Sequence, residues 1–372
     1  MRDECSEMNL RLTGVSTPTP SDWDAVWQTS PQATYFQSRQ WGEIWERYSR
    51  GRIQATPLAF TFSDQSRLIL PLYISKKYKG MGRKCVLSPA HSHGGWISKG
   101  RPNAAHGKRV WSHLIHHLGK RTLLEWRISP FIDFPPPAPL APAGRHTADV
   151  THLLDLKDGF SALQNRWQAG KGAMARKIKK AEGAGVRIRR ARTPQDWADY
   201  FEIYQQSLAR WGKARSLGYG NELFELLRRR DPDHVALWLG EYENRRICGA
   251  LCFSSPHHTV YWHGAALSEY FHLRPVNLLM ARIIQDAAEK GCRWFDFNPS
   301  GGYDGVTRFK ESFKPIPHPV PVLTHRPLAM DCLERVSQLK HQIRSQAADL
   351  PRWNPQSLKR KISNTRQKNG PA

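Results

Sequence analysis

The chain has 372 residues, of which 40% are hydrophobic and 10% aromatic, a composition of folded rather than disordered proteins. At this length two domains are the usual expectation. The formal net charge of +24 favours contact with polyanions such as RNA, DNA, an anionic membrane surface or a phosphate-bearing substrate.

Several classes of protein are disfavoured by what the sequence lacks. The six cysteines contain no Cys-x-x-Cys pair, so neither a zinc ribbon nor a disulfide framework is expected. No Walker A loop, Gly-x-Gly-x-x-Gly, Gly-x-Ser-x-Gly or His-Glu-x-x-His motif occurs. The first residues lack the apolar stretch of a signal peptide, and no run of about 18 apolar residues occurs, so we expect a cytoplasmic protein without a transmembrane segment.

Composition divides the chain into five parts. The proline-rich segment 130–145 can form neither a helix nor a central strand, so it is the predicted linker between two domains. The predicted parts are a flexible leader (1–20), an N-terminal domain (21–129), the linker (130–145), a C-terminal domain (146–328) and a basic tail (329–372).

The N-terminal domain begins with aromatic residues at helical spacing. Trp41 and Trp45 lie on one face of a predicted helix, and such aromatic side chains belong more often to a core than to a ligand stack. Residues 53–62 and 67–74 are predicted strands that flank a turn and form a hairpin. A helix is predicted over residues 104–119.

Five cations follow the hairpin within residues 76–84. Lys77 and Lys79 are candidates to bind phosphates of a substrate, and the alternative is a solvated loop. His91 and His93 lie in the glycine-bearing loop that comes next. Two histidines without a nearby third ligand do not indicate zinc, so we expect no metal site.

The second half opens with a cationic segment, in which residues 171–192 contain nine Lys or Arg and one acid, Glu182. The alanines among them indicate a helix with a cationic face. Arg176, Lys177 and Lys180 are its candidate contacts to a polyanion, and a solvated helix is the alternative.

Three strands are predicted next, over residues 235–242, 247–254 and 259–266, and the hairpin-length loops between them make this sheet antiparallel. A helix over residues 275–290 and a last strand near 319–323 complete the domain.

The stretch 291–313 combines a strand, a glycine turn and a short helix that Asp304 is expected to cap. Phe309 and Phe313 are four residues apart and would share the buried face of that helix. Free backbone N–H groups and the positive end of a helix meet at such a junction and suit an anion or a developing oxyanion. The alternative is a surface turn in which Lys310 is solvated.

Three segments together resemble the FemAB-like branch of the GNAT acyltransferase superfamily. The glycine turn followed by Gly-Val-x-x-Phe-Lys-x-x-Phe (residues 305–313) is similar to the C-terminal signature of that branch. The basic segment 175–186 resembles its basic helix leading into a strand, and Phe-Gln-Ser with the two tryptophans (residues 36–45) resembles a motif near its start.

The resemblance implies an α/β (α+β) fold with two tandem GNAT-like units, each a mixed, largely antiparallel sheet flanked by helices. The N-terminal unit would be a degenerate copy that helps to form the acceptor cleft. Members of the branch include enzymes that move an aminoacyl group from charged tRNA to an amine of a peptidoglycan precursor. Others are acetyltransferase-like proteins of exopolysaccharide or envelope pathways.

The resemblance also implies site residues. Lys310 would stabilise charge in an acyl transfer, with Phe309 beside it in the site. Asp296, on the preceding strand, is a candidate base, and a structural carboxylate is the alternative. Backbone and hydroxyl groups that could bind substrate are those of Ser300, Gly301, Gly302 and Tyr303.

The donor is the main alternative that the sequence leaves open. GNAT enzymes that use acyl-CoA hold its pyrophosphate on a glycine-rich loop, whereas the matching segment here, Ser268–Pro275, has no glycine and ends in a proline without an N–H group. This favours aminoacyl-tRNA over acyl-CoA as the donor cosubstrate, with no permanently bound cofactor. The expected acceptor is an envelope precursor or a small amine.

Two other functions remain open. One is an acyl-CoA-dependent N-acetyltransferase of polysaccharide or envelope biosynthesis. The other is a non-catalytic protein that binds RNA or an anionic membrane surface through an old transferase scaffold, since the basic charge alone would also serve that role.

Overall fold

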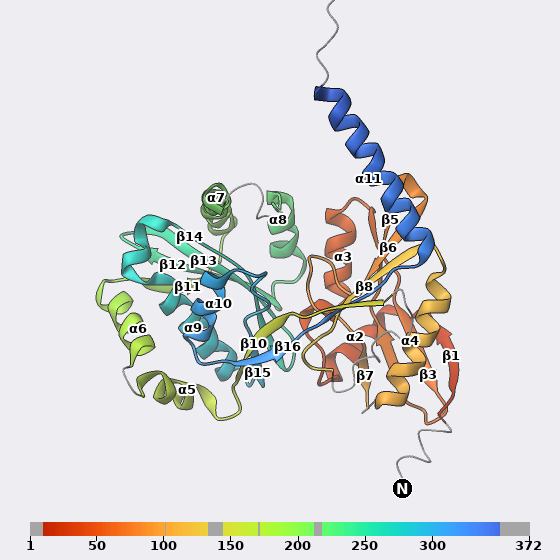
Figure 1. Ribbon diagram of the computed structural model, residues 1–372. Helices are drawn as coiled ribbons and strands as arrows, with labels where there is room; N and C mark the ends of the chain where they lie inside the picture. The colour runs from red at the N-terminus through yellow and green to blue at the C-terminus, as the bar shows by residue number, and fades with distance from the viewer. Residues whose placement is uncertain (1–9, 101, 133–143, 170–171, 212–217, 350–372) are drawn as a thin grey trace, which may run out of the picture.

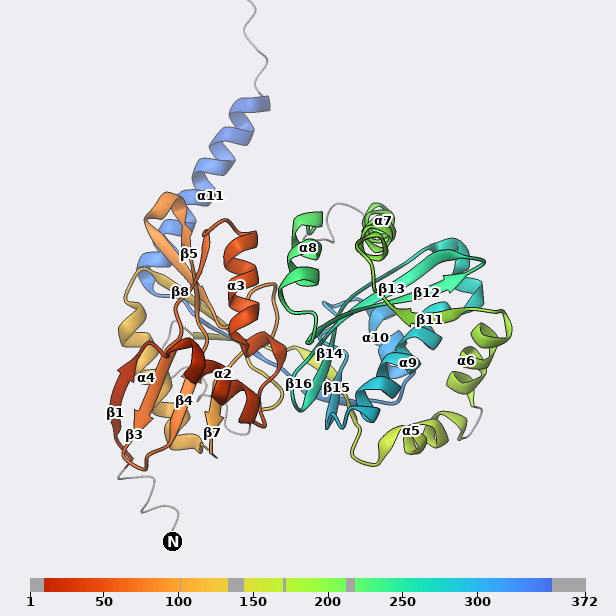
Figure 2. The same ribbon diagram turned by 180° about the vertical axis from the view of Figure 1, so that it is seen from behind.

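Two large β-sheets form the framework of the computed structural model, which describes residues 10–100, 102–132, 144–169, 172–211 and 218–349 (Figures 1 and 2). The sheet of the N-terminal unit has the order β2 (Ile53–Ala55), β5 (Tyr73–Lys77), β6 (Gly82–Val86), β8 (Thr122–Arg127), β17 (Val322–His325) and β9 (Gly144–Thr147). The strands β6 and β8 are parallel, and their neighbours are antiparallel.

The sheet of the C-terminal unit repeats this plan. Its order is β11 (Arg187–Arg190), β12 (Val235–Tyr242), β13 (Arg245–Ser254), β14 (His258–Ala266), β15 (Trp294–Asp296), β10 (Val150–Asp155) and β16 (Ile316–Pro319). Here β14 and β15 are the parallel pair. In each unit a helix connects the two parallel strands: α4 (Ala104–Leu118) in the first, and α9 (Pro275–Glu289) in the second.

A smaller sheet and the remaining helices complete the fold. The smaller sheet has the order β1 (Leu12–Ser16), β3 (Leu58–Phe62), β4 (Arg67–Leu70) and β7 (Ile97–Lys99). The other helices are α2 (Pro20–Thr29), α3 (Arg39–Tyr48), α5 (Gly159–Gln168), α6 (Ala173–Gly183), α7 (Pro194–Trp211), α8 (Asn221–Arg230), α10 (Asp304–Glu311) and α11 (Leu328–Asp349), with short 3₁₀ helices η1 (Tyr35–Gln37), η2 (Tyr78–Gly80) and η4 (Ser268–Leu273). No helix within the described ranges is both long and apolar enough to span a membrane.

A two-stranded ribbon belongs to both large sheets. One side is β9 followed by β10, and the other is β16 followed by β17. Thr147 pairs with Val322 in the first sheet, and Val150 pairs with Pro319 in the second, so the antiparallel register continues from one unit into the other. Each unit therefore receives the last two strands of its large sheet from the same ribbon, which couples the positions of the two units.

The alternation of side chains on β13 divides the C-terminal unit into two layers. Leu251 and Phe253 face the cluster that contains α7, whereas Ala250 and Cys252 face the cluster that contains α9. This period of two is the one expected for a strand that is buried on both faces.

The α7 face of that sheet shares a core with the N-terminal unit. Tyr35 stacks on Phe253 with ring centroids 4.8 Å apart, and Trp41 lies 5.3 Å from the same ring. All three side chains are fully buried. The contact between the units is thus a continuous hydrophobic core, and Trp41 and Trp45 belong to it.

The predicted hairpin at residues 53–74 forms, but it divides between two sheets. The inner strands β3 and β4 pair in the smaller sheet, whereas the outer strands β2 and β5 pair in the large one. Pro57 and Pro71 lie at the two break points, where a residue without an N–H group ends a ladder. Pro321 likewise separates β16 from β17, where one last strand was expected.

The predicted domain limits stay a prediction. Within the segment expected to be a flexible leader, Leu12–Ser16 forms β1, which pairs with β3. Most of the proline-rich linker (residues 133–143) and the end of the basic tail (residues 350–372) lie outside the described residues. The part of the tail that is described forms α11, which projects from the N-terminal unit (Figure 1).

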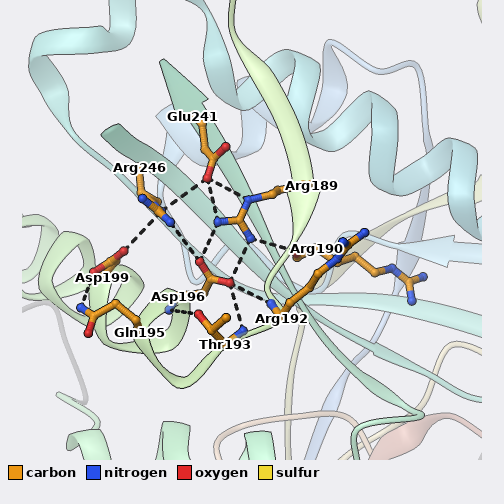
Figure 3. Close-up of polar contacts among 9 residues, drawn as sticks. All are labelled: Arg189, Arg190, Arg192, Thr193, Gln195, Asp196, Asp199, Glu241 and Arg246. Atoms are coloured by element: carbon orange, nitrogen blue, oxygen red, sulfur yellow. Dashed lines mark hydrogen bonds and ion pairs between the residues drawn. The ribbon is translucent and has the colours of Figure 1, made fainter. Parts of the chain in front are cut away.

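Ion pairs neutralise part of the cationic run that precedes α7 (Figure 3). The carboxylate of Asp196 accepts hydrogen bonds from the Arg189 guanidinium at 2.6 and 2.9 Å and from the backbone N–H of Arg192 at 2.8 Å. These bonds hold the pKa of Asp196 well below its usual range, although burial opposes the shift. Arg189 also pairs with Glu241, so it is a structural residue and not a free cation.

We expect Asp196→Asn to lower the free energy of unfolding by about 2 kcal/mol at pH 7, because it removes the buried charge that Arg189 and the backbone N–H of Arg192 bind and leaves Arg189 with Glu241 alone. The pKa of Asp196 is depressed in the folded state, so its stabilisation is present above the unfolded pKa of about 3.9 and is lost as the pH falls below it. Urea unfolding at pH 7 and pH 3 measures both effects. The control Glu182→Gln removes an exposed pair with Arg282 and should change stability by less than about 1 kcal/mol; an equal loss in both variants would refute the assignment.

Candidate active site

The carboxylate of Asp296, at the end of β15, is held by groups from both units. Its side chain is fully buried. It accepts hydrogen bonds from the Thr151 hydroxyl on β10, from the backbone N–H of Asn298 at 2.8 Å, and from His93 Nε2 at 2.9 Å. Since a carboxylate only accepts, His93 Nε2 carries the proton in this contact. His93 comes from the N-terminal unit, so the site lies where the two units meet.

These donors keep Asp296 charged. Burial alone would raise the pKa of the carboxyl, but the hydrogen bond and charge of His93, with the bonds from Thr151 and Asn298, lower it overall. A carboxylate with a lowered pKa is a weak base, so Asp296 acts more readily as a fixed negative charge than as a proton acceptor.

Lys310, on α10, is buried beside this carboxylate. Only 3% of the residue is exposed, and Nζ donates to the backbone carbonyl of Asn298 at 2.6 Å. Burial lowers the pKa of Lys310 from 10.5 to about 8, while the charges of Asp296 and Asp149 raise it in part. A buried lysine with a pKa of about 8 can carry a charge at neutral pH and can also exchange a proton there.

Backbone geometry in the loop after β15 directs the carbonyl of Asn298 to Lys310. Asn298 has a φ of 60°, in the left-handed region that asparagine tolerates better than most residues. Its side-chain Oδ1 and the hydroxyl of Ser300 are buried and have no hydrogen-bond partner among the described residues. Unsatisfied buried acceptors of this kind are costly and gather where a polar ligand or water binds.

The other residues of the predicted glycine turn lie at the surface. Gly301 and Gly302 are exposed and have positive φ values of 62° and 80°. Tyr303 is 38% exposed and is the N-cap of α10, whereas Asp304, which the sequence predicts as the cap, is the first residue inside the helix. Ser300 is the residue of this predicted set whose hydroxyl is buried without a partner among the described residues.

Phe309 lies on the core side of α10. It packs against the cluster that contains Phe313, whose ring centroid is 5.4 Å from its own. Phe309 and Phe313 therefore hold α10 against the C-terminal unit, and this packing brings Lys310, the next residue, to the buried site.

Three histidines near the centre were not predicted as site residues. His93 was considered in the sequence only as a metal ligand together with His91, and that role was not expected. His152, on β10, is 5% exposed and has no partner for Nδ1 among the described residues; burial first, and then the charge of Lys310, lowers its pKa. His258 Nε2 donates to the backbone carbonyl of Pro31 at 2.8 Å, and burial lowers the pKa of His258 to about 4. The one sequence signal was the position of His93 in a glycine-bearing loop.

A known protein family matches the segment that carries Asp296 and Lys310. The model of the acetyltransferase (GNAT) domain family matches residues 169–311, which include Asp296 and Lys310. This part of the chain is similar in sequence to the GNAT acetyltransferase domain. No curated protein sequence matches the chain.

Solved structures with a similar fold cover nearly the whole chain. The crystal structure of FemX has a TM-score of 0.63 at 11% identity, over 87% of this chain and 99% of that one. The C-terminal domain of a putative lysylphosphatidylglycerol synthetase from Agrobacterium fabrum has 0.54 at 12% (86% and 95%), and L-PGS from Bacillus licheniformis has 0.52 at 14% (86% and 95%). The chain therefore has the fold of two GNAT-like units, as predicted.

The cationic candidates of the GNAT domain lie on α6. Arg176 and Lys180 are exposed, and neither forms an ion pair within the described part of the chain. Lys177 lines a cavity of about 240 Å³ between α6 and the end of α10, with Arg166, Glu311 and Lys314. Of the three α6 candidates, only Lys177 therefore lies beside the end of the helix that carries Lys310.

Lys77 and Lys79 lie elsewhere. Both are exposed, at the end of β5 and in η2, where the neighbouring Tyr78 donates to Glu334 of α11 at 2.9 Å. Figure 1 shows β5 beside α11 and far from α6. The two groups of predicted cations are therefore not brought together.

We expect Lys310→Met to raise the free energy of unfolding at pH 7 by as much as about 3 kcal/mol, because it removes a buried charge whose pKa is lowered by burial. A lowered lysine pKa costs stability below about pH 8, and this cost disappears as the pH rises towards 10.5. The gain should therefore shrink between pH 8 and 10.

Chemical unfolding at pH 7 and pH 10 measures the difference, and Lys314→Met, at an exposed position, is the matched control. A loss of stability in Lys310→Met at both pH values would show that Lys310 is held for structure rather than for function.

Proposed function

We propose that the protein transfers an acyl group to an amine, with Lys310 as the catalytic residue. The observation that carries this proposal is the buried ammonium of Lys310, with a pKa of about 8, in the GNAT domain and beside a fixed carboxylate. A protein that only bound RNA or a membrane would gain nothing from this costly arrangement.

The arrangement accounts for the steps of the transfer. The acceptor amine attacks the carbonyl of an ester donor, a C–N bond forms, and negative charge develops on the carbonyl oxygen. The Lys310 ammonium stabilises that charge, as a preorganised donor in a water-poor site. When the C–O bond breaks, Lys310 gives a proton to the leaving oxygen, and the proton lost by the amine restores its charge. Asp296 keeps Lys310 positioned and charged.

The donor that we propose is aminoacyl-tRNA. CoA-dependent enzymes present free backbone N–H groups at the place that η4 and the start of α9 occupy here. In this chain those N–H groups donate to carbonyls of the same segment: Tyr270 to Leu267, Arg274 to Phe271, and Asn277 to Arg274, at 3.1 to 3.3 Å. Pro275, at the start of α9, has no N–H group. A pyrophosphate would find little to bind here.

The surface of α6 supports the same donor. Arg176 and Lys180 are exposed on α6 and Lys177 lines the cavity at the end of α10, and a nucleic acid backbone is a polyanion that such a cationic surface attracts. The proposed acceptor is an amine of an envelope precursor. FemX and L-PGS are similar to this chain in fold, and this similarity supports the proposed transfer chemistry.

Purified protein supplied in parallel with labelled aminoacyl-tRNA and labelled acyl-CoA should transfer label only from the tRNA to a peptidoglycan precursor or a simple amine. Lys310→Ala should lower kcat by about 10² to 10³ with little change in tRNA affinity. Transfer from acyl-CoA alone would overturn the donor assignment and support an N-acetyltransferase. Binding of RNA without transfer from either donor, and equal function of the Lys310→Ala variant, would support a non-catalytic binder.

The pH profile of kcat should fall above about pH 8, since the Lys310 ammonium must be present to stabilise the oxyanion. In Lys310→Arg the guanidinium stays protonated, so the descending limb should move to higher pH while the rate falls at all pH values. Steady-state rates from pH 6 to 10 test this, and an unchanged descending limb in the arginine variant would assign it to another group.

A further inference from the structure

The N-terminal unit has a cavity at the position that corresponds to the reaction centre of the GNAT domain. In the GNAT domain the parallel pair β14 and β15 ends at Val260 and Asp296, and in the N-terminal unit the parallel pair β6 and β8 ends at Val86 and Glu125. In both units a carboxylate thus occupies the last paired position of the second strand. In each unit the parallel pairing of the two strands ends at that point.

Charged side chains line the cavity in the N-terminal unit. The cavity has a volume of about 160 Å³, and its charged lining residues are Lys84, Glu125 and Arg127. Lys84 Nζ lies 2.9 Å from a Glu125 oxygen, and Arg127 pairs with Asp149 outside the cavity. These three side chains are between 18% and 30% exposed, so they are partly shielded from water. Two cations and one anion therefore meet in one small space.

The loop that forms one wall of the cavity has a strained backbone, and two residues that line the cavity have hydroxyl groups without a hydrogen-bond partner. Ala90 and His91 have φ values of 57° and 55°, in the left-handed region that is costly for residues other than glycine. The hydroxyls of Ser92 and Tyr73, two further lining residues, are buried without a hydrogen-bond partner among the described residues. Strain and unsatisfied polar groups in one place are typical of sites that hold a ligand.

We propose that this cavity binds a small zwitterion of the α-amino acid type. Lys84 and Arg127 would hold its carboxylate, and Glu125 would hold its ammonium group, so that both charges of the ligand are matched. Apolar atoms of Ile53, Val86 and Pro89 complete the lining for a side chain. The cavity is smaller than the roughly 300 Å³ at which sites for larger ligands begin, which favours a ligand of amino acid size over a nucleotide or a CoA.

Two lining residues of the cavity, Ser92 and Arg127, connect it to the proposed reaction centre. Ser92 lines it, and the next residue, His93, donates to Asp296. Arg127 lines it as well, and its partner Asp149 is one of the charges that support the protonated form of Lys310. A bound zwitterion would therefore lie next to the residues that hold the proposed catalytic lysine. The binding site itself does not depend on the proposed acyl transfer.

Calorimetric titration of the full chain with glycine and the other nineteen standard amino acids in their L form tests the proposal. At least one should bind, and its methyl ester and its N-acetyl derivative, which each lack one charge, should bind at least tenfold more weakly. The double variant Lys84→Met/Glu125→Gln removes one cation and the anion together, leaves neither without its partner, and should also weaken binding at least tenfold.

Two control variants tie the binding to this cavity. Glu182→Gln, which changes an exposed ion pair, and Lys310→Ala should both retain binding, so a loss of acyl transfer and a loss of this site remain distinguishable. Failure of all twenty amino acids to bind, or equal binding of the ester and N-acetyl forms, would overturn the proposal. The comparison of derivatives uses the unaltered protein, so it decides the matter even if the double variant does not fold.

Discussion

The buried hydrogen bond between His93 and Asp296 is the contact on which the candidate site depends. A carboxylate without access to water is stable as a charge only when donors surround it, and Asp296 receives them from β10, from its own loop and from the other unit. The charged carboxylate in turn supports the ammonium of Lys310. A displacement of one unit against the other would remove His93 and change the proton affinity of both groups.

The fold holds that contact in two ways. The ribbon of β9, β10, β16 and β17 runs through both large sheets, so the ladder hydrogen bonds of one unit are continuous with those of the other. The aromatic cluster around Tyr35, Trp41 and Phe253 then fills the space between the units as a single core. Both features resist the sliding and opening that are common between domains joined by a linker alone.

The two units illustrate how one architecture supports different chemistry. Each has a parallel strand pair joined by a helix, and each places a carboxylate where the parallel pairing ends. In the GNAT domain that carboxylate is fully buried and its charge acts on a lysine from α10, whereas Glu125 is partly exposed and pairs with Lys84 on the neighbouring strand. The difference in burial makes the first the candidate reaction centre and leaves the second as a charged pocket.

Local patterns in the sequence were sufficient for much of the C-terminal unit. The strands β12 to β14, the helix α9 and the strand, turn and helix around Lys310 follow from alternation, helical spacing and glycine, all of which act over a few residues. The same patterns, with the family resemblance, indicated Lys310 and Asp296 before their surroundings were known.

Other features were decided by the tertiary structure, because they join residues that are far apart in the chain. His93 and Asp296 are separated by 203 positions, and no local pattern pairs them. The ribbon that completes both sheets, the division of the 53–74 hairpin between two sheets, and the neutralisation of Arg189 by Asp196 depend likewise on which strands and helices pack together. Local preference determines which elements form, but burial and charge pairing across the whole chain determine which side chains become buried, charged and able to react.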